Sequence, residues 1–213
     1  MPLTFKNLPF SKQHSLLVIC VAFLAIVAFL FNDALSNLLV YQHKLISQGE
    51  LWRTFTGHFL HTNGIHLLLN LAALILLWAL HGHFYSLKNY SMLFISSALI
   101  CSAGLYFLSP DIGQYVGLSG VLHGIFIFGA IMDIRDKDKT GYLLFICLWL
   151  KIAHEQFYGA SEEVSALIDA SVAIDAHLWG AIGGLFFSCC YLLVNKKKAP
   201  AIDKNNDMSN KKD

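Results

Sequence analysis

The stretch Gly117-Leu118-Ser119-Gly120 opens an apolar run that continues to about residue 132. A second apolar run, from about residue 176 to residue 194, begins with Ala176-His177. Reactive or ionisable groups inside membrane-length segments usually face the interior of a helix bundle or a water-filled cavity, and they usually mark function. These two segments therefore predict a membrane-embedded helix bundle with Ser119 and His177 at its functional site.

The composition is typical of a polytopic membrane protein. Of the 213 residues, 56% are hydrophobic and 14% are charged, whereas soluble domains carry about 25% charged residues. The mean hydropathy is +0.56, and the length allows one compact bundle. A net charge of +1 argues against nucleic acid or an acidic partner. The five cysteines lie in apolar runs without metal-ligand spacing, so we interpret them as small apolar residues of helices.

Six apolar segments of roughly 15–20 residues can be distinguished, close to the ~20 residues needed to cross a hydrocarbon layer. The first has no signal-peptide cleavage site after it, so we expect it to be retained. The predicted fold class is an all-α membrane protein with a six-helix domain at residues 14–194. We expect a cytoplasmic N-terminus at residues 1–13 and a disordered, lysine-rich cytoplasmic tail at residues 195–213. The six segments cover residues 14–31, 64–80, 90–108, 116–132, 140–154 and 176–194.

The basic residues predict the orientation of the bundle. If both termini lie on one side, 12 of the 15 Lys and Arg residues fall on that side. The opposite side then carries only Lys44, Arg53 and Lys151. Because basic loops stay in the cytoplasm, we expect both termini there, which requires an even number of spans.

The first outer connection, residues 32–63, is too long for a tight turn and too apolar for a solvated loop. Apolar side chains alternate there with charged residues and histidines, which is typical of an amphipathic element in the membrane interface. We expect Trp52 and Arg53 to lie at the depth of the lipid headgroups.

Ser119 has the surroundings of a nucleophile. Gly117 and Gly120 flank it, so the backbone there can turn sharply and a substrate chain can approach closely. The amide groups at a helix N-terminus would face developing negative charge. The alternative is that Gly120-x-x-x-Gly124 is only a helix-contact motif.

His177 would supply the base that a serine hydroxyl needs. Gly180 and Gly184 share its helical face, so this helix can approach another closely and bring the imidazole to Ser119. The alternative is a histidine bonded to a neighbouring helix. Asp175 is two residues from His177 and would face elsewhere, and no other acid lies within a predicted span, so a dyad is expected.

His66 and Asn70 are spaced by four residues and lie on one helical face, where both can donate hydrogen bonds. Acyl transfer needs such donors around the developing oxyanion. Alternatively, Asn70 only joins helices together.

Metal sites are not supported by the sequence, and no cofactor is expected. His154-Glu155 resembles the start of a zinc-protease motif, but Tyr158 occupies the place of the second histidine. His58, His61 and His66 have no accompanying carboxylates, so an interfacial role fits them better than a metal cluster.

The chain resembles the rhomboid intramembrane serine proteases from about Trp52 to Gly184. That resemblance implies Ser119 as nucleophile, His177 as general base and acid, and His66 with Asn70 as oxyanion-hole donors. It also implies that Trp52 and Arg53 belong to a loop that braces the fold. The motifs that carry it are Trp52-Arg53, His66-x-x-x-Asn70, Gly117-x-Ser119-Gly120 and Ala176-His177-x-x-Gly180-x-x-x-Gly184.

One position departs from the general family pattern. Where many bacterial rhomboids have a tyrosine that packs on the catalytic histidine, this chain has His123, which either stacks similarly or changes the basicity of His177. The short chain and the run from Gly117 to Gly124 look most like the rhombosortase branch. That branch is associated with removing C-terminal membrane tails containing Gly-Gly from exported proteins.

The resemblance implies a multi-pass protein of the bacterial inner membrane whose active site opens to the outer side. Its partners would be the lipid bilayer and single-span membrane proteins, cleaved in or near the transmembrane segment. Two other functions remain open. One is a non-catalytic rhomboid relative that binds or chaperones membrane helices. The other is a small transporter or proton channel, against which the lack of buried carboxylates and of repeated halves weighs.

Overall fold

The computed structural model describes residues 8–196, and the expectations for residues 1–7 and for most of the tail lie outside the described residues. Six long helices account for most of the fold, and each coincides with a predicted apolar segment. They are α1 (Lys12–Leu30), α5 (Gly64–His81), α6 (Leu87–Leu108), α7 (Ser119–Arg135), α8 (Lys139–Tyr158) and α10 (Ile174–Lys196).

The prediction of an all-α membrane protein is confirmed in its coarse form. Four of the long helical segments have the length and apolarity to cross a membrane, namely those beginning at Lys12, Gly64, Leu87 and Ile174. By the same criteria α7, with 17 residues, is too short. Helix α8 has 20 residues but falls outside the set because it is less apolar.

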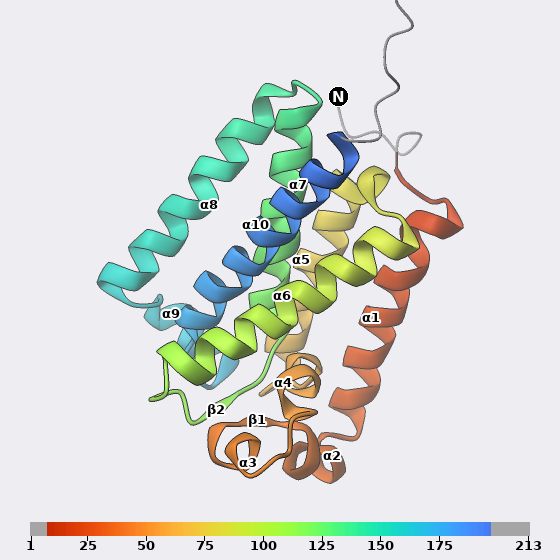
Figure 1. The fold of residues 1–213 in the computed structure, drawn as a ribbon. Helices are drawn as coiled ribbons and strands as arrows, with labels where there is room; N and C mark the ends of the chain where they lie inside the picture. The colour runs from red at the N-terminus through yellow and green to blue at the C-terminus, as the bar shows by residue number, and fades with distance from the viewer. Residues whose placement is uncertain (1–7, 197–213) are drawn as a thin grey trace, which may run out of the picture.

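Helix α10 packs against both α6 and α7, and the largely buried α7 is in contact with α5, α6, α8 and α10 (Figure 1). Helix α8 packs on the outer side of α7, and α1 with α5 completes the bundle on the other side (Figure 1). The helices α5, α7 and α10 begin, and α8 ends, at the same end of the molecule. Side chains near these four helix ends therefore converge.

Glycine pairs bring α7 and α10 into backbone contact. A Cβ atom added to Gly180 would lie 1.9 Å from the carbonyl oxygen of Gly120. One added to Gly184 would lie 2.1 Å from the carbonyl oxygen of Gly124. Two helices approach this closely only where neither carries a side chain, which is the small-residue packing common in membranes.

The first connection folds into short elements: α2 (Asn32–Leu39), β1 (Tyr41–Gln42), α3 (His43–Ser47), α4 (Arg53–Thr56) and the 3₁₀ turn η2 (Gly57–Phe59). Trp52 is half exposed, whereas Arg53 is only 3% exposed. The guanidinium of Arg53 donates to Glu50 Oε2 at 2.6 Å and to the carbonyls of Val40 and Asn37, both at 2.8 Å.

The depth of Arg53 in the membrane stays a prediction, but its charge is paired inside the protein. Its charge lies inside because the last turn of α2 leaves carbonyl groups without helical partners, and a cation is favourable at that end of a helix. The indole of Trp52 donates to another of these carbonyls, that of Leu38, at 3.0 Å. The two residues together fasten α2 to α4.

Strand β1 pairs antiparallel with β2 (Gln114–Tyr115), with Tyr41 opposite Tyr115. The amide of Gly117 also donates to the carbonyl of Gly57 at 3.2 Å. These bonds join the first connection to the loop that leads into Ser119. Two further short elements are η3 (Gly82–Phe84) and α9 (Glu162–Ile168), and the second lies close to the start of α5.

Candidate active site

Ser119 is the first residue of α7, directly after a turn that only glycine adopts easily. Gly117 has φ +124°, and a Cβ atom there would lie 2.9 Å from His66 Nε2. The hydroxyl of Tyr115 donates to the Gly117 carbonyl at 2.6 Å and accepts from the Gly120 amide at 3.4 Å. Tyr115 was not singled out in the sequence, and it holds the turn that presents Ser119.

His177 lies in the first turn of α10 and faces Ser119. The Ser119 hydroxyl is 3.2 Å from His177 Nε2, within hydrogen-bond distance. The imidazole is buried, with 5% of the residue exposed. The close glycine contacts between α7 and α10 begin directly below this pair, so the packing of the two helices determines the distance between hydroxyl and imidazole.

His66 and Asn70 lie on the first two turns of α5 and face the same turn. The side chain of Asn63 caps this helix by accepting from the His66 amide at 2.8 Å. His66 Nδ1 lies 3.1 Å from Thr62 Oγ1 and 3.5 Å from the Thr62 amide nitrogen, and Nε2 is the ring nitrogen nearest to Gly117. Asn70 Nδ2 lies 3.9 Å from the position that a Gly117 Cβ would take. The imidazole of His66 and the amide of Asn70 thus both reach the backbone that leads into Ser119.

His123 stacks on His177. The two ring centroids are 4.1 Å apart and the ring planes are inclined by 16°. His123 Nδ1 lies 2.7 Å from the Ser119 carbonyl oxygen, to which it donates. Of the two roles left open by the sequence, stacking on His177 is the one that the geometry matches.

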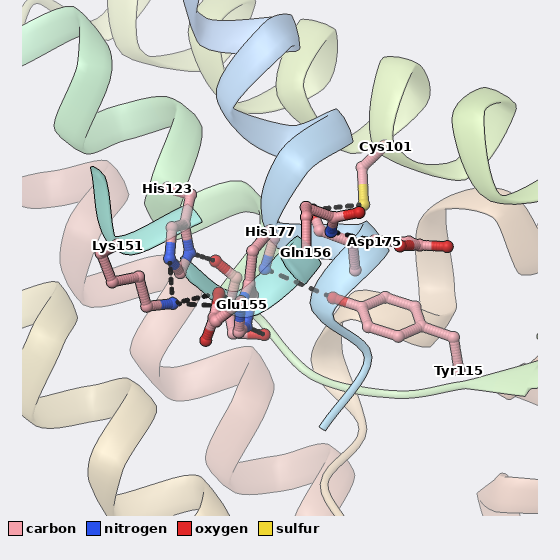
Figure 2. Close-up of polar contacts among 11 residues, drawn as sticks. Cys101, Tyr115, His123, Lys151, Glu155, Gln156, Asp175 and His177 are labelled. Carbon is pink, nitrogen blue, oxygen red and sulfur yellow. Dashed lines mark hydrogen bonds and ion pairs between the residues drawn. The ribbon is translucent and has the colours of Figure 1, made fainter. Parts of the chain in front are cut away.

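A carboxylate also contacts His177, although the sequence analysis expected none. Glu155 Oε2 lies 2.9 Å from His177 Nδ1, and Lys151 Nζ lies 2.8 Å from the same oxygen. Lys151 Nζ also lies 2.9 Å from His123 Nε2 and 3.1 Å from His177 Nδ1. Figure 2 shows these four side chains pointing toward one another. Asp175, by contrast, accepts a hydrogen bond from Gln156 at 3.2 Å.

The sequence does not predict the role of Glu155, because the fifth apolar segment ends at residue 154 and Glu155 then falls in the following loop. Helix α8 continues to Tyr158, so Lys151 and Glu155 lie one turn apart on the same face. That spacing of four residues was the available signal.

Three ligand atoms at this place could hold a metal ion. One atom each from His123, Glu155 and His177 lies within 4.8 Å of the others. The Lys151 ammonium lies within hydrogen-bond distance of all three, so a cation already neutralises the group. The absence of a metal or cofactor therefore stays a prediction.

His58 and His61 are buried in the protein, with 1% of each residue exposed. His58 Nε2 lies 3.1 Å from the Ala98 carbonyl oxygen. Burial lowers the pKa of His58 to about 4 and that of His61 to about 3. Both rings are therefore neutral at physiological pH and belong to the core.

A cavity of about 280 Å³ opens beside Ser119 and His66. Its far wall is the segment that follows α9, which presents the small residues Ala170, Ser171 and Ala173. Thr62 donates to the Ile168 carbonyl at 2.6 Å, which fastens α9 over this cavity. The cavity is large enough for a few small side chains of an extended peptide.

The fold and the site define a class: a helical membrane protein with a serine and a histidine in hydrogen-bond contact at one end of the bundle. The chain belongs to the rhomboid family, since the family described as "Rhomboid domain" matches residues 48–194. This is a family of serine intramembrane proteases, which act on membrane proteins within the lipid bilayer. A protein of Bacillus subtilis (strain 168) described as "Putative rhomboid protease YdcA" is 26% identical over 155 residues, 72% of each chain.

Proposed function

We propose that this protein is an active intramembrane serine endopeptidase with Ser119 as nucleophile and His177 as general base. The observation that carries the proposal is the 3.2 Å contact between Ser119 Oγ and His177 Nε2 at a buried position of a rhomboid fold. A serine hydroxyl becomes a nucleophile when an adjacent base takes its proton. Binding alone would not need this contact, which argues against a non-catalytic helix-binding protein.

In the proposed reaction, Ser119 Oγ attacks the carbonyl carbon of the scissile peptide bond while His177 Nε2 takes the hydroxyl proton. His66, Asn70 and the Ser119 amide stabilise the oxyanion. His177 then gives the proton to the leaving amine, and the peptide bond breaks. Water, deprotonated by His177, hydrolyses the acyl-enzyme on Ser119 and restores the free enzyme.

The proposed topology has six spans and both termini in the cytoplasm, and the site opens to the outer side of a bacterial inner membrane. Helix α7, at 17 residues, has a length of about 25 Å, slightly short of a ~30 Å hydrocarbon layer. A short α7 fits an active site recessed below the outer surface. The basic residues Lys12, Lys88 and Arg135 lie at the helix ends opposite to the site, in agreement with a cytoplasmic side there.

The proposed substrates are single-span membrane proteins with small or helix-breaking residues near the outer end of the span. A helix satisfies its own backbone hydrogen bonds, so it must unwind before Ser119 can attack. The small residues in the wall of the cavity suit Gly-Gly tails of the rhombosortase type. Helix-stabilising substitutions at the cleavage region should slow cleavage, and equal rates would refute this substrate requirement. If the acyl group on Ser119 is transferred to an amine instead of to water, the cleavage product will have a larger mass than the hydrolysed product.

The test of the proposed function is labelling of the purified protein with a fluorophosphonate probe, which reacts with activated serines. We expect labelling of the wild type and none of Ser119→Ala or His177→Ala, with thermal unfolding unchanged in both variants. A folded wild type that does not react with the probe or cleave a membrane substrate would favour the non-catalytic alternative.

A further inference from the structure

We propose that Glu155 orients His177, so that the site works as a Ser119–His177–Glu155 triad held in place by Lys151 and His123. This inference rests on the proposed function and adds a positioning residue to it. Glu155 comes from α8 and His177 from α10, so the contact also joins two helices.

The carboxylate is placed as a positioning group requires. Glu155 Oε2 lies 2.9 Å from His177 Nδ1, on the opposite side of the ring from Nε2 and Ser119. The side chain of Glu155 is 12% exposed and that of His177 is 7% exposed. A carboxylate this far from water is stabilised by its partners, here the Lys151 ammonium at 2.8 Å.

His123 determines how Lys151 is held. A carbonyl oxygen can only accept, so His123 Nδ1 carries the proton that is donated to the Ser119 carbonyl. His123 Nε2 is then unprotonated and accepts from Lys151 at 2.9 Å. The ammonium is thereby fixed between His123 and Glu155.

The tautomer of His177 depends on which neighbour contacts Nδ1. If Nδ1 carries the proton and donates to Glu155, Nε2 is free to accept the proton of Ser119. If Lys151, at 3.1 Å, donates to Nδ1 instead, the proton lies on Nε2 and His177 cannot act as a base. Glu155 favours the first arrangement, which is the productive one.

Glu155 also balances charge during the reaction. When His177 takes the proton of Ser119 it becomes a cation 3.1 Å from the Lys151 ammonium. The other titratable rings facing it are His123, stacked at 4.1 Å, and His66 from α5. Glu155 is the negative charge in contact with His177 among the described residues, so it offsets the repulsion between Lys151 and the imidazolium.

The first experiment measures the rate constant of fluorophosphonate labelling in Glu155→Gln. In a serine protease whose triad carboxylate becomes an amide, the loss is about 10⁴-fold, so we expect a loss of about 10²–10⁴-fold. The control Glu163→Gln removes an exposed carboxylate of α9 whose hydrogen bond is to Ser161, and it should label at the wild-type rate. The double variant Lys151→Met/Glu155→Gln should recover part of the rate, because the competing donor is gone.

The second experiment does not depend on activity. In Ser119→Ala protein with ¹⁵N-labelled histidine, His177 is assigned by its loss in His177→Gln. We expect its proton on Nδ1, and a shift of the population toward Nε2 when Glu155→Gln is added. Thermal unfolding checks that each variant is folded.

The outcomes separate the two proposals. Wild-type labelling rates in Glu155→Gln, with an unchanged tautomer, would overturn the triad and leave the protease intact. A wild type that does not label, with a tautomer that depends on Glu155, would overturn the protease and leave the positioning role. Loss of rate with the expected tautomer shift and partial recovery in the double variant would support the triad.

Discussion

Replacing Gly180 with alanine should reduce activity much more than stability. The added Cβ would lie 1.9 Å from the Gly120 carbonyl oxygen, whereas real Cβ contacts are essentially never under 3.0 Å. Helix α10 must therefore move away from α7 by about 1 Å. Overpacking of this kind costs about 1–3 kcal/mol, and the higher helix propensity of alanine offsets about 1 kcal/mol of it. A net destabilisation of about 0–2 kcal/mol should leave the protein folded.

The same movement would separate the proposed catalytic pair. Shifting α10 by about 1 Å stretches the 3.2 Å contact between Ser119 Oγ and His177 Nε2 to about 4 Å, beyond hydrogen-bond distance. A misplacement of about 1 Å can lower a rate by about 10²-fold. We therefore expect Gly180→Ala to label with fluorophosphonate about 10²-fold more slowly than the wild type.

The assay measures labelling rates and thermal unfolding of the same detergent-purified samples. Gly113→Ala is the matched control, because a Cβ atom at Gly113 would meet nothing within 4 Å. It should behave as the wild type in both measurements. A Gly180→Ala protein that labels at the wild-type rate would refute the claim that backbone contact between α7 and α10 determines the geometry of the pair.

Three further predictions concern other parts of the molecule. Asn70→Ala should keep a slow activity, about 10²–10³-fold below the wild type in substrate cleavage, because one oxyanion donor is lost; an unchanged rate would exclude that role. Arg53→Lys should lower the free energy of unfolding by about 2 kcal/mol, since an ammonium cannot keep all three bonds to Glu50 and the α2 carbonyls. An unaltered unfolding temperature would contradict the role of Arg53 in capping the end of α2. His58 alone should lower stability by up to about 3 kcal/mol as the pH decreases from about 6.5 to about 4, because the unfolded chain protonates His58 in that range while the folded protein, with a His58 pKa of about 4, does not. His61, with a pKa of about 3, adds a loss of its own over the same range. In His58→Asn, the free energy of unfolding should decrease less over this pH range than in the wild type. An identical pH dependence would assign the effect to other groups.

The helices could be predicted from apolarity, but their ends could not. The fourth apolar segment was predicted to begin near residue 116, whereas α7 begins at Ser119. Val116 and Leu118 are as apolar as the helix itself, but they lie between strand β2 and α7, in a turn with positive φ at Gly117. Apolarity reports burial in the membrane and does not distinguish an extended chain from a helical one.

The parts of the site that could not be predicted depend on contacts between elements that are far apart in the sequence. Ser119, His177, His66 and Asn70 could be proposed because their spacing has a chemical meaning within single helices. Glu155 acquires its role only through the packing of α8 beside α10, which the sequence does not encode locally. Arg53 is a similar case, since its burial depends on the carbonyls of α2.

The position of His177 on the last helix that the structure describes has a consequence for biogenesis. Ribosomes deliver α7 with Ser119 before α8, α9 and α10 have been synthesised, so the nascent chain at first contains the proposed nucleophile without its proposed base. Helix α10 must then enter between α6 and α7, and only its arrival brings the imidazole to the hydroxyl. The order of synthesis thus keeps the described part of the chain inert toward its neighbours in the translocon until α10 has packed against α6 and α7.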